Sequence, residues 1–434
     1  MAAIAVVLAA CPAPAELPGS SPSPGGPTPT LAAPGSGSPI RFGVLGEPAT
    51  LDPYSDVASE NTWTIARAIY PSLFRLLPDG TTRPDLAAGL EVRDGGAVVS
   101  VDRGATWSDG SPLTARDVVA TWRRARRAPA PSGFRDIDGA RAPDPTTVVL
   151  AGRVDDWEET LARITYILPR GRHGGVTGGP FRITRRTPGL EVVLEPSPYW
   201  FGEPRATQRI RVQFIRTTGT MLGLLEAGRL EAAAVPWAVN LRQRARAAGL
   251  VAEAALGWET IRLRFGPGLT RAERAGFVDA LDPRAFEERL VRGDGRLATT
   301  LHPSPEGAAG PYGSIRGGAP PEGEITVTSP AGDGSLTLLL RGIYAQLDAA
   351  GVLAEASPID PFIFYGEWVS DDPSDVSLRR AGGAPGLDDP PDDASRLDHF
   401  PLFHVASYLV SVKGLEGLEV NPTFDGPLWN AHEW

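Results

Sequence analysis

The stretch that decides the fold is residues 41–80, RFGVLGEPATLDPYSDVASENTWTIARAIYPSLFRLLPDG. Its first residues continue an apolar run that starts at Ile40 and predicts a strand over residues 40–45. Two prolines in the link that follows, residues 46–53, end any regular strand ladder. Apolar side chains then recur at three- and four-residue spacing from Trp63 onward, which predicts a helix.

A second apolar run, residues 73–77, follows this helix and stops at an Asp-Gly turn. A strand, an exposed link bounded by prolines, a helix and a second strand are typical of the ligand-facing edge of an α/β domain. We therefore expect backbone amides and carboxylates of the link to lie at the mouth of a binding cleft.

Length and composition set the class of protein. The chain has 434 residues, enough for two or three domains with a large buried core. Its 42% hydrophobic and 22% charged residues are typical of soluble globular proteins. The net charge of −10 argues against nucleic acid or an anionic lipid surface as the main partner.

A single cysteine, Cys11, ends an apolar N-terminal run, MAAIAVVLAAC. This run resembles a bacterial lipobox, in which signal peptidase cuts before the cysteine and the thiol carries diacylglycerol. The alternative is an ordinary apolar N-terminus with a buried cysteine. Residues 12–39 are rich in proline, glycine, serine and threonine, which predicts an extended, disordered tether. One cysteine allows neither an intrachain disulfide nor a cysteine metal cluster.

Local patterns predict further elements in the body of the chain. Residues 83–90 are expected to form a short helix, residues 94–96 a hairpin turn before a strand, and residues 155–167 another helix. Thr114 is a natural N-cap for a helix, and Asp117, three residues on, nearly completes a capping box with it.

The most specific motif is residues 107–118, WSDGSPLTARDV. It strongly resembles the turn and helix motif of the family 5 extracellular solute-binding proteins, the peptide-, nickel- and sugar-binding receptors of ABC importers. Three shorter segments resemble the same family: GEPATLDP from Gly46, TGGPF from Thr177 and PYW from Pro198. The glycines of TGGPF are not followed by Gly-Lys-Ser/Thr, so they do not predict a phosphate-binding loop.

The resemblance implies an α/β fold with two lobes, like that of periplasmic binding proteins, with mixed sheets, an extra subdomain in the first lobe and a hinge between the lobes. The chain is expected to cross out of the first lobe near residues 258–264 and to return near residues 402–409. The expected parts are a signal segment at 1–11, the tether at 12–39, the first lobe at 40–260 with its extra subdomain at about 54–170, the second lobe at 261–400, and a return segment at 401–434 that completes the first lobe and docks on it.

No catalytic constellation stands out. The five histidines form no H-x-x-x-H pair, and no G-x-S-x-G segment is present. The acidic pairs 371–372, 388–389 and 392–393 are adjacent in sequence, so on an extended strand their side chains point to opposite faces. We therefore predict no enzyme activity, no metal site and no cofactor, and keep a secreted hydrolase as the weaker alternative.

The resemblance also implies a ligand site. In peptide-binding members the ligand lies as an added strand between the link after the first strand and an aromatic-acidic loop of the second lobe. On this chain those positions are residues 46–49 and 368–372. The candidate ligand-binding residues are Glu47, Ala49, Tyr365, Trp368, Asp371, Asp372 and Arg379.

Within this site each polar side chain has an expected role. Trp368 would stack on the ligand, Asp371 or Asp372 would accept a cationic group, and Arg379 would meet a carboxylate. The simpler alternative is that Trp368 belongs to the core and the aspartates cap a turn.

The sequence therefore predicts a monomeric, extracytoplasmic binding protein, held by lipid at the outer face of the cytoplasmic membrane. It would capture a small molecule or short peptide and deliver it to the permease subunits of an ABC importer. The other binding hypothesis is a sensor or envelope module that works without a transport partner.

Overall fold

The computed structural model describes residues 38–128, 132–171, 175–203, 208–301, 310–360, 364, 372–381 and 394–434, without the side chains of residues 257 and 258. Cys11 lies outside this part of the chain, and so does the expected tether except for residues 38 and 39. Within the described part, none of the helices is both long and apolar enough to cross a membrane.

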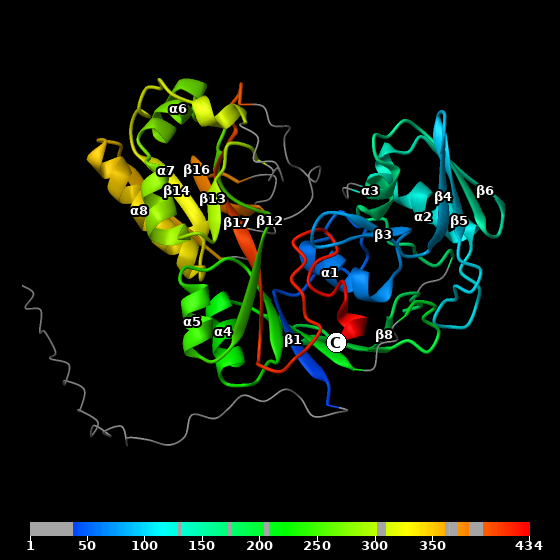
Figure 1. The fold of residues 1–434 in the computed structure, drawn as a ribbon. Helices are drawn as coiled ribbons and strands as arrows, with labels where there is room; N and C mark the ends of the chain where they lie inside the picture. The colour runs from blue at the N-terminus through cyan, green and yellow to red at the C-terminus, as the bar shows by residue number, and fades with distance from the viewer. Residues whose placement is uncertain are drawn as a thin grey trace, which may run out of the picture. The chain divides into compact units, whose positions relative to one another are not determined.

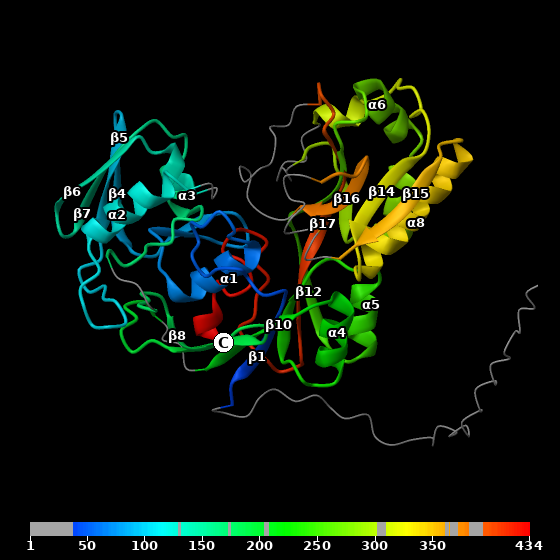
Figure 2. The same cartoon turned by 180° about the vertical axis from the view of Figure 1, so that it is seen from behind.

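A large mixed sheet runs through the described residues (Figures 1 and 2). Its first strand, β1 (Ile40–Leu45), confirms the strand predicted for residues 40–45. β1 pairs in parallel with two neighbours, whereas the two longest strands, β12 and β17, pair antiparallel. The order across the sheet is β15 (Ala354–Ile359), β14 (Ile325–Pro330), β16 (Val376–Ala381), β12 (Val251–Phe265), β17 (His399–Ser411), β11 (Ala232–Val235), β1, β10 (Ile210–Ile215), β9 (Glu191–Pro196) and β8 (Phe181–Thr187), with β13 (Gly295–Leu297) paired to β17.

Two smaller sheets complete the strand structure. One joins β2 (Phe74–Leu76) to β3 (Thr82–Pro84), and the other has the order β4 (Ala87–Arg93), β5 (Gly96–Val101), β7 (Thr147–Ala151), β6 (Gly139–Asp144). The helices are α1 (Glu60–Ile69), α2 (Ala115–Ala125), α3 (Trp157–Ala162), α4 (Thr218–Glu226), α5 (Leu241–Ala247), α6 (Arg271–Asp279), α7 (Pro283–Phe286) and α8 (Gly334–Ala349).

The alternation of β1 explains its place in the sheet. Ile40, Phe42 and Val44 are almost completely buried, and the last two pack in one core cluster with residues of α1. On the opposite face a Cβ added to Gly43 would lie 2.8 Å from a methyl carbon of Leu230, so the backbone of β1 lies close to the packing around α4. Helices thus cover both faces of the sheet at β1.

The helix predicted for residues 83–90 is wrong. β3 ends at Pro84, which has no N–H to donate, and residues 87–93 form β4 instead. β4 pairs with β5 through the predicted hairpin turn, in which Gly95 has a φ of 78°. Pairing with β5 therefore overrides the helical tendency of the alanines and leucine in this segment.

The helix predicted for residues 155–167 is confirmed only in part, since α3 covers Trp157–Ala162. Ile164 has a φ of 47°, a left-handed conformation that a helix cannot continue through. This turn sends Tyr166 and Ile167 into the core, where both are fully buried. Packing of these two side chains thus ends the helix before the local pattern does.

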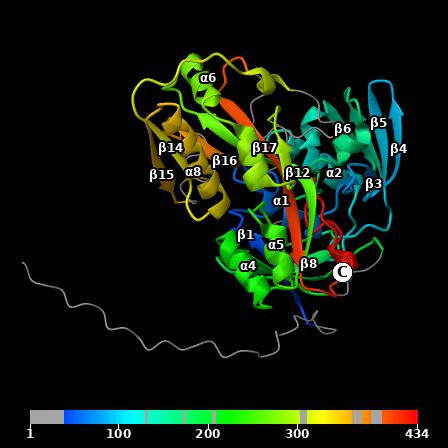
Figure 3. The same ribbon diagram turned by 60° about the vertical axis from the view of Figure 1, so that its left-hand side comes forward.

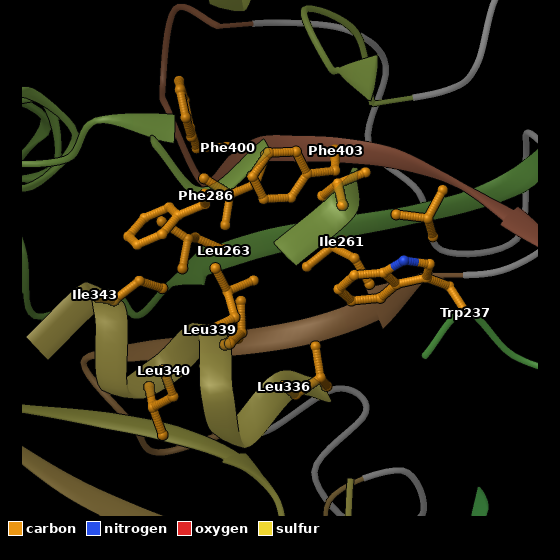
Figure 4. Close-up of a cluster of buried hydrophobic side chains, with 14 of the residues drawn as sticks. Trp237, Ile261, Leu263, Phe286, Leu336, Leu339, Leu340, Ile343, Phe400 and Phe403 are labelled. Carbon is orange, nitrogen blue, oxygen red and sulfur yellow. The ribbon is translucent and has the colours of Figure 1, made fainter. Parts of the chain in front are cut away.

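The longest helix, α8, packs on the sheet through Leu336, Leu339, Leu340 and Ile343 (Figures 3 and 4). These side chains meet apolar residues of the sheet, among them Ile261 and Leu263 of β12 and Phe403 of β17. Trp237, which follows β11, lies beside Leu336 at the N-terminal end of the helix. The end of β11 is therefore packed against the start of α8.

The expected outward and return crossings fall within β12 and β17. These strands pair from Val251 with Ser411 to Arg264 with His399, and the register shifts twice between those ends. Whether they act as a hinge stays a prediction, as do the expected domain boundaries.

The C-terminal segment packs on the first strands of the chain, as the sequence predicts. The ring of Trp434 lies 5.6 Å from that of Phe42. The side-chain amide of Asn421 donates to the carbonyl of Leu76 at 2.9 Å, and the backbone N–H of Leu76 donates to Asp425 at 3.0 Å.

Candidate functional site

The link after β1 holds the first two candidate residues. The Glu47 carboxylate accepts a hydrogen bond from the backbone N–H of Gly189 at 2.6 Å and lies 3.2 Å from the Arg186 guanidinium. Both partners belong to the region of β8 and its turn into β9. Ala49 is exposed. Glu47 therefore fixes the link to the neighbouring hairpin, and its side chain is 27% exposed.

Asp372 and Arg379 are brought together. A guanidinium nitrogen of Arg379 donates to the Asp372 carboxylate at 2.6 Å, and the backbone N–H of Ser374 donates to it at 2.9 Å. Arg264 lies 3.5 Å away, and the guanidinium of Arg379 lies 4.9 Å from the ring centre of Phe364.

Hydrogen bonds and charge set the protonation of this aspartate. Burial by itself would raise the pKa of Asp372, but hydrogen bonds from Ser374, Ser377 and Arg379 outweigh it and lower the pKa. Asp372 is therefore a buried anion, and its partner Arg379 lies in the strand that follows, β16. Tyr365, Trp368 and Asp371 lie outside the described residues.

A second polar cluster, which the sequence did not reveal, gathers around Arg380 in β16. Its guanidinium donates to the carbonyl of Trp237 at 2.7 Å and to the carboxylate of Asp333 at 2.6 Å, and it forms an ion pair with Glu259. The same guanidinium lies 5.7 Å from the Trp237 ring centre. We call Arg380, Trp237, Asp333 and Glu259 the Arg380 cluster.

The elements of the sheet explain why these residues meet. Trp237 follows the carboxyl end of β11, and Asp333 follows the carboxyl end of β14. Asp333 also caps α8, because its carboxylate accepts the backbone N–H groups of Ser335 and Leu336 at 3.0 Å each. Ligands of open α/β sheets bind outside the carboxyl ends of their strands, which is where this cluster lies.

Glu60, the first residue of α1, adds a fourth charge near the cluster. Burial among neighbouring atoms, and secondly the charge of Glu259, raise the pKa of Glu60 to about 7. The residue nevertheless keeps an exposed surface. Solvent therefore reaches Glu60 at a position where the charge of Glu259 acts on it.

The acidic groups around the Arg380 cluster have shifted pKa values. Burial raises the pKa of Glu259, although Arg380 opposes the shift. Burial alone would raise the pKa of Asp333, but Arg380 outweighs it and lowers the pKa. Among the described residues, Arg380 pairs with Glu259 and Asp333, and Glu60 adds a further acid whose pKa the charge of Glu259 raises.

Two sequence signals could have located the Arg380 cluster. One is the position of Trp237 and Asp333 directly after buried strands. The other is the adjacent pair Arg379 and Arg380, whose side chains must point to opposite faces of a strand. The side of the strand on which each arginine finds its acid depends on tertiary pairing, which local sequence does not specify.

Among the residues that the structure describes, no group of three or more histidine, cysteine or acidic side chains is placed to hold a metal ion.

Residues 81–391, more than two thirds of the chain, match the family described as bacterial extracellular solute-binding proteins, family 5 Middle. The chain belongs to this family. The fold and the motif at residues 107–118 agree with this membership, so the family 5 resemblance seen in the sequence is confirmed.

Solved structures show that this family 5 protein has the two-lobed α/β fold of periplasmic binding proteins. The oligopeptide-binding protein AppA from Bacillus subtilis, in complex with a nonapeptide, gives a TM-score of 0.76 at 15% identity and covers 93% of this chain and 99% of its own. The periplasmic EDTA-binding protein EppA gives a TM-score of 0.78 at 17% identity, with 94% and 98% covered. NikZ from Campylobacter jejuni, in complex with Ni(L-His), gives 0.73 at 15% identity, with 91% and 99% covered.

One curated relative shares a segment with this family 5 protein. The probable deoxycholate-binding periplasmic protein YgiS of Escherichia coli strain K12 is 31% identical over 119 residues. That segment covers 27% of this chain and 22% of YgiS. These relatives are solute-binding proteins rather than enzymes, and their periplasmic names imply an extracytoplasmic location.

Proposed function

We propose that this family 5 protein captures a small, peptide-like ligand outside the cytoplasm and delivers it to the permease of an ABC importer. The observation that carries the proposal is the family match over residues 81–391, together with a fold that covers 99% of the AppA chain. The solved relatives hold guests as different as a nonapeptide and Ni(L-His), so family membership alone does not select the ligand.

The charges of the Arg380 cluster support an amine-bearing ligand. Glu259 lies near enough to Glu60 for its charge to raise the pKa of Glu60. Arg380 pairs with Glu259 and offsets only part of this negative charge. An ammonium group placed between the two carboxylates would relieve their repulsion and gain charge-assisted hydrogen bonds. The amino terminus of a short peptide has this chemistry.

The candidate residues from the sequence complete the proposed site. Trp368 stacks on the ligand, and Asp371 supplies a further carboxylate beside it. Because Asp372 is already held by Arg379 and Ser374, its proposed role is to hold that loop end in place. Glu47 and Ala49 form the edge along which the peptide backbone lies, with Tyr365 as a second aromatic contact.

The proposed location follows from Cys11. A lipid on this cysteine would hold the protein at the outer face of the cytoplasmic membrane. The proposed state of the protein there is a monomer. Residues 12–39 would then serve as the tether between the membrane and the binding body.

A thermal-shift screen with dipeptides to pentapeptides, sugars and metal ions tests the proposed function. A ligand at a hundred times its Kd stabilises the folded state by about 2.7 kcal/mol. We expect short peptides with a free amino terminus to raise the melting temperature, and amino-acetylated peptides of the same sequence to raise it less. A shift with sugars or metal ions only would contradict the peptide proposal.

Two variants locate the site. Trp368→Ala and Glu60→Gln should each abolish or reduce the shift, whereas Tyr199→Ala, which removes an aromatic side chain of a residue 44% exposed, should leave it intact. If Trp368→Ala keeps the full shift, the proposed aromatic contact is wrong.

A further inference from the structure

An arginine-rich surface lies on the large sheet, several strands away from β16 and the Arg380 cluster. It is formed by β8, β9 and β10, the last strands in the order that starts at β15 (Figure 2). Four arginines surround two glutamates there, and we call this set the arginine ladder: Arg182, Arg185, Arg209, Arg211, Glu191 and Glu195.

The register of the strands explains why the ladder forms. Ile210 and Val212 of β10 point into the core, as do Val192 and Leu194 of β9. The residues between them therefore share the opposite face of the sheet. On that face, basic residues of the outer strands flank acidic residues of the middle strand, β9.

Each glutamate of the ladder pairs with two arginines, whereas each arginine pairs with one of the glutamates. Glu191 has a side chain only 2% exposed, and it pairs with Arg185 at 2.6 Å and with Arg211 at 2.7 Å. Glu195 pairs with Arg209 at 2.9 Å and with Arg182 at 3.5 Å. Four positive charges against two negative ones leave the ladder with a local charge of +2.

The arginine side chains remain open to solvent. That of Arg185 is 60% exposed and that of Arg209 is 52% exposed. A guanidinium has five N–H donors, and one carboxylate accepts only some of them. The glutamates therefore hold the arginines in place, and the donors that they do not occupy remain for a further acceptor.

A pocket of about 300 Å³ opens between these arginines. It is lined by Arg185, Arg209 and Arg211, together with Glu195, Thr184 and Pro39. Arginine donors in a fixed array bind phosphate oxygens in pairs, which a single flexible cation does less well. The pocket has room for a phosphodiester group.

Pro39 connects this pocket with the N-terminal segment. It comes directly before β1 and is the last residue of the predicted tether. The chain therefore leaves the binding body beside the arginines.

We propose that the arginine ladder docks the protein on an anionic membrane by binding phospholipid headgroups. The proposal rests on the proposed lipid anchor at Cys11 for its position in the cell, although binding of headgroups can be tested without the lipid. The predicted tether has 28 residues, which limits how far an anchored body can move from the bilayer. A protein anchored at Cys11 would thus keep the ladder close to the bilayer.

The net charge of −10 does not prevent such docking. Charges further away than about 10 Å are largely screened at physiological salt, so the local charge of the ladder decides its contact with the membrane. Docking in this orientation would also fix which face of the binding body turns away from the membrane. The ladder would supplement the lipid anchor rather than replace it, so the proposal does not make anionic lipid the main partner.

Vesicle sedimentation tests the proposal. The full chain with Cys11→Ser, which cannot carry the lipid, is mixed with vesicles of phosphatidylcholine alone or with phosphatidylglycerol added. We expect binding only to the anionic vesicles, and weaker binding at higher salt. Each basic residue near an anionic surface strengthens binding about fivefold, so Arg185→Gln with Arg209→Gln should weaken it about 25-fold.

A matched pair of substitutions serves as the control. Arg116→Gln with Arg123→Gln removes the same charge from two exposed positions of α2 and should leave vesicle binding unchanged. Thr184→Glu places a carboxylate in the pocket without removing an ion pair, and it should weaken binding as well. Unchanged melting temperatures of the variants would show that the fold is intact.

Three outcomes would overturn the proposal: equal binding to neutral and anionic vesicles, equal weakening by the control pair, or no effect of Thr184→Glu. Inorganic phosphate is tested last, as a free ligand for the pocket. If phosphate at millimolar concentration stabilises the protein and anionic vesicles do not bind, the pocket takes free phosphate rather than a headgroup. Peptide-induced thermal shifts are measured separately, so failure of docking and failure of the proposed ligand function are distinguishable.

Discussion

Two buried arginines connect distant parts of the chain at single-residue scale. Arg67 of α1 lies 2.7 Å from Asp85 and 3.4 Å from Asp425, and Arg75 of β2 lies 2.9 Å from the other oxygen of Asp85. All four side chains are at most 4% exposed. Buried charges of this kind are tolerated only when they are paired and hydrogen-bonded.

We predict that Asp85→Asn lowers the free energy of unfolding at pH 7 by about 3 kcal/mol or more, because it leaves two buried guanidinium groups with only Asp425 as their acid. Urea unfolding measures the change. Asp94→Asn is the control: Asp94 is exposed, and its change should stay within about 0.5 kcal/mol. A loss below about 1 kcal/mol for Asp85→Asn would contradict the prediction.

The same residue predicts the acid limb of the stability curve. Burial alone would raise the pKa of Asp85, but the charges of Arg75 and Arg67 outweigh it and hold the pKa at about 2. A depressed folded-state pKa adds stability that is present above the unfolded pKa of about 4 and is lost as the pH falls towards 2. The stability difference between the wild type and Asp85→Asn should therefore shrink between about pH 4 and 2.

Glu60 predicts the opposite dependence on pH. Its pKa is raised to about 7 by burial and by Glu259, so its charge opposes folding above that pH. Stability is favoured below the unfolded pKa of about 4.5 and is lost as the pH rises through 7. Without ligand, Glu60→Gln should therefore melt at a higher temperature than the wild type at pH 8 and at nearly the same temperature at pH 4.5.

Melting curves over this range measure the effect of Glu60. Glu324→Gln changes an exposed acid elsewhere, and its difference from the wild type should not vary over the same range. A Glu60→Gln profile parallel to that of the wild type would show that the pKa of this carboxyl group is not raised.

At the scale of an element, the N-terminus of α2 depends on one side chain. The Asp117 carboxylate accepts the backbone N–H of Thr114 at 2.9 Å and its hydroxyl at 3.0 Å, which confirms the capping box. Its other oxygen accepts the backbone N–H of Arg170 at 3.2 Å. The family motif at residues 107–118 thus carries a cap that also fixes a distant loop.

We predict that Asp117→Ala lowers the free energy of unfolding by about 1–2 kcal/mol, since it leaves the backbone N–H groups of Thr114 and Arg170 without this acceptor. Chemical denaturation measures the loss. Arg116→Ala, at the neighbouring exposed position, should change stability by less than about 0.5 kcal/mol. Equal effects of the two substitutions would rule out a special role for the cap.

Elements with strong local signals could be predicted from the sequence. β1 and α2 were predicted because alternation and capping are properties of a few adjacent residues. β4 was missed because its extended form depends on pairing with β5, and α3 was overextended because the turn at Ile164 depends on the core. Long-range contacts override weak local preference in both cases.

The candidate site divides in the same way. The loop around residue 372 could be located from its motif-like aromatic and acidic residues. The partners of Arg380 could not be predicted, because its hydrogen bonds and ion pairs reach residues up to 143 positions away. The pairing of Asp372 with Arg379 spans only 7 positions, but it depends on how the chain enters β16. Sequence patterns identify charged residues, whereas the fold decides which charges are matched.

At the scale of the whole molecule, the C-terminal segment completes the first strands of the chain. Asp425 supplies one of the acids for Arg67, and the carbonyl of Trp429 accepts from Arg75 at 3.1 Å. We predict that a chain ending at residue 418 does not fold, because it loses these partners and the packing of Trp434 on Phe42. Far-UV and near-UV circular dichroism measure the loss.

Trp434→Ala is the matched control for this truncation. It removes the side chain of a partly buried residue and should leave a folded protein that is less stable by about 1–2 kcal/mol, below the cost of an aromatic-to-alanine change in a core. A cooperative unfolding transition in the truncated chain would contradict the role assigned to the segment.

The position of β17 between β11 and β12 affects how the protein is made. β11 and β12 are both translated long before residues 399–411 leave the ribosome, yet each needs that late strand as its neighbour. The edge of each strand that faces β17 stays unpaired through most of synthesis. The central sheet is therefore completed only when translation is nearly finished.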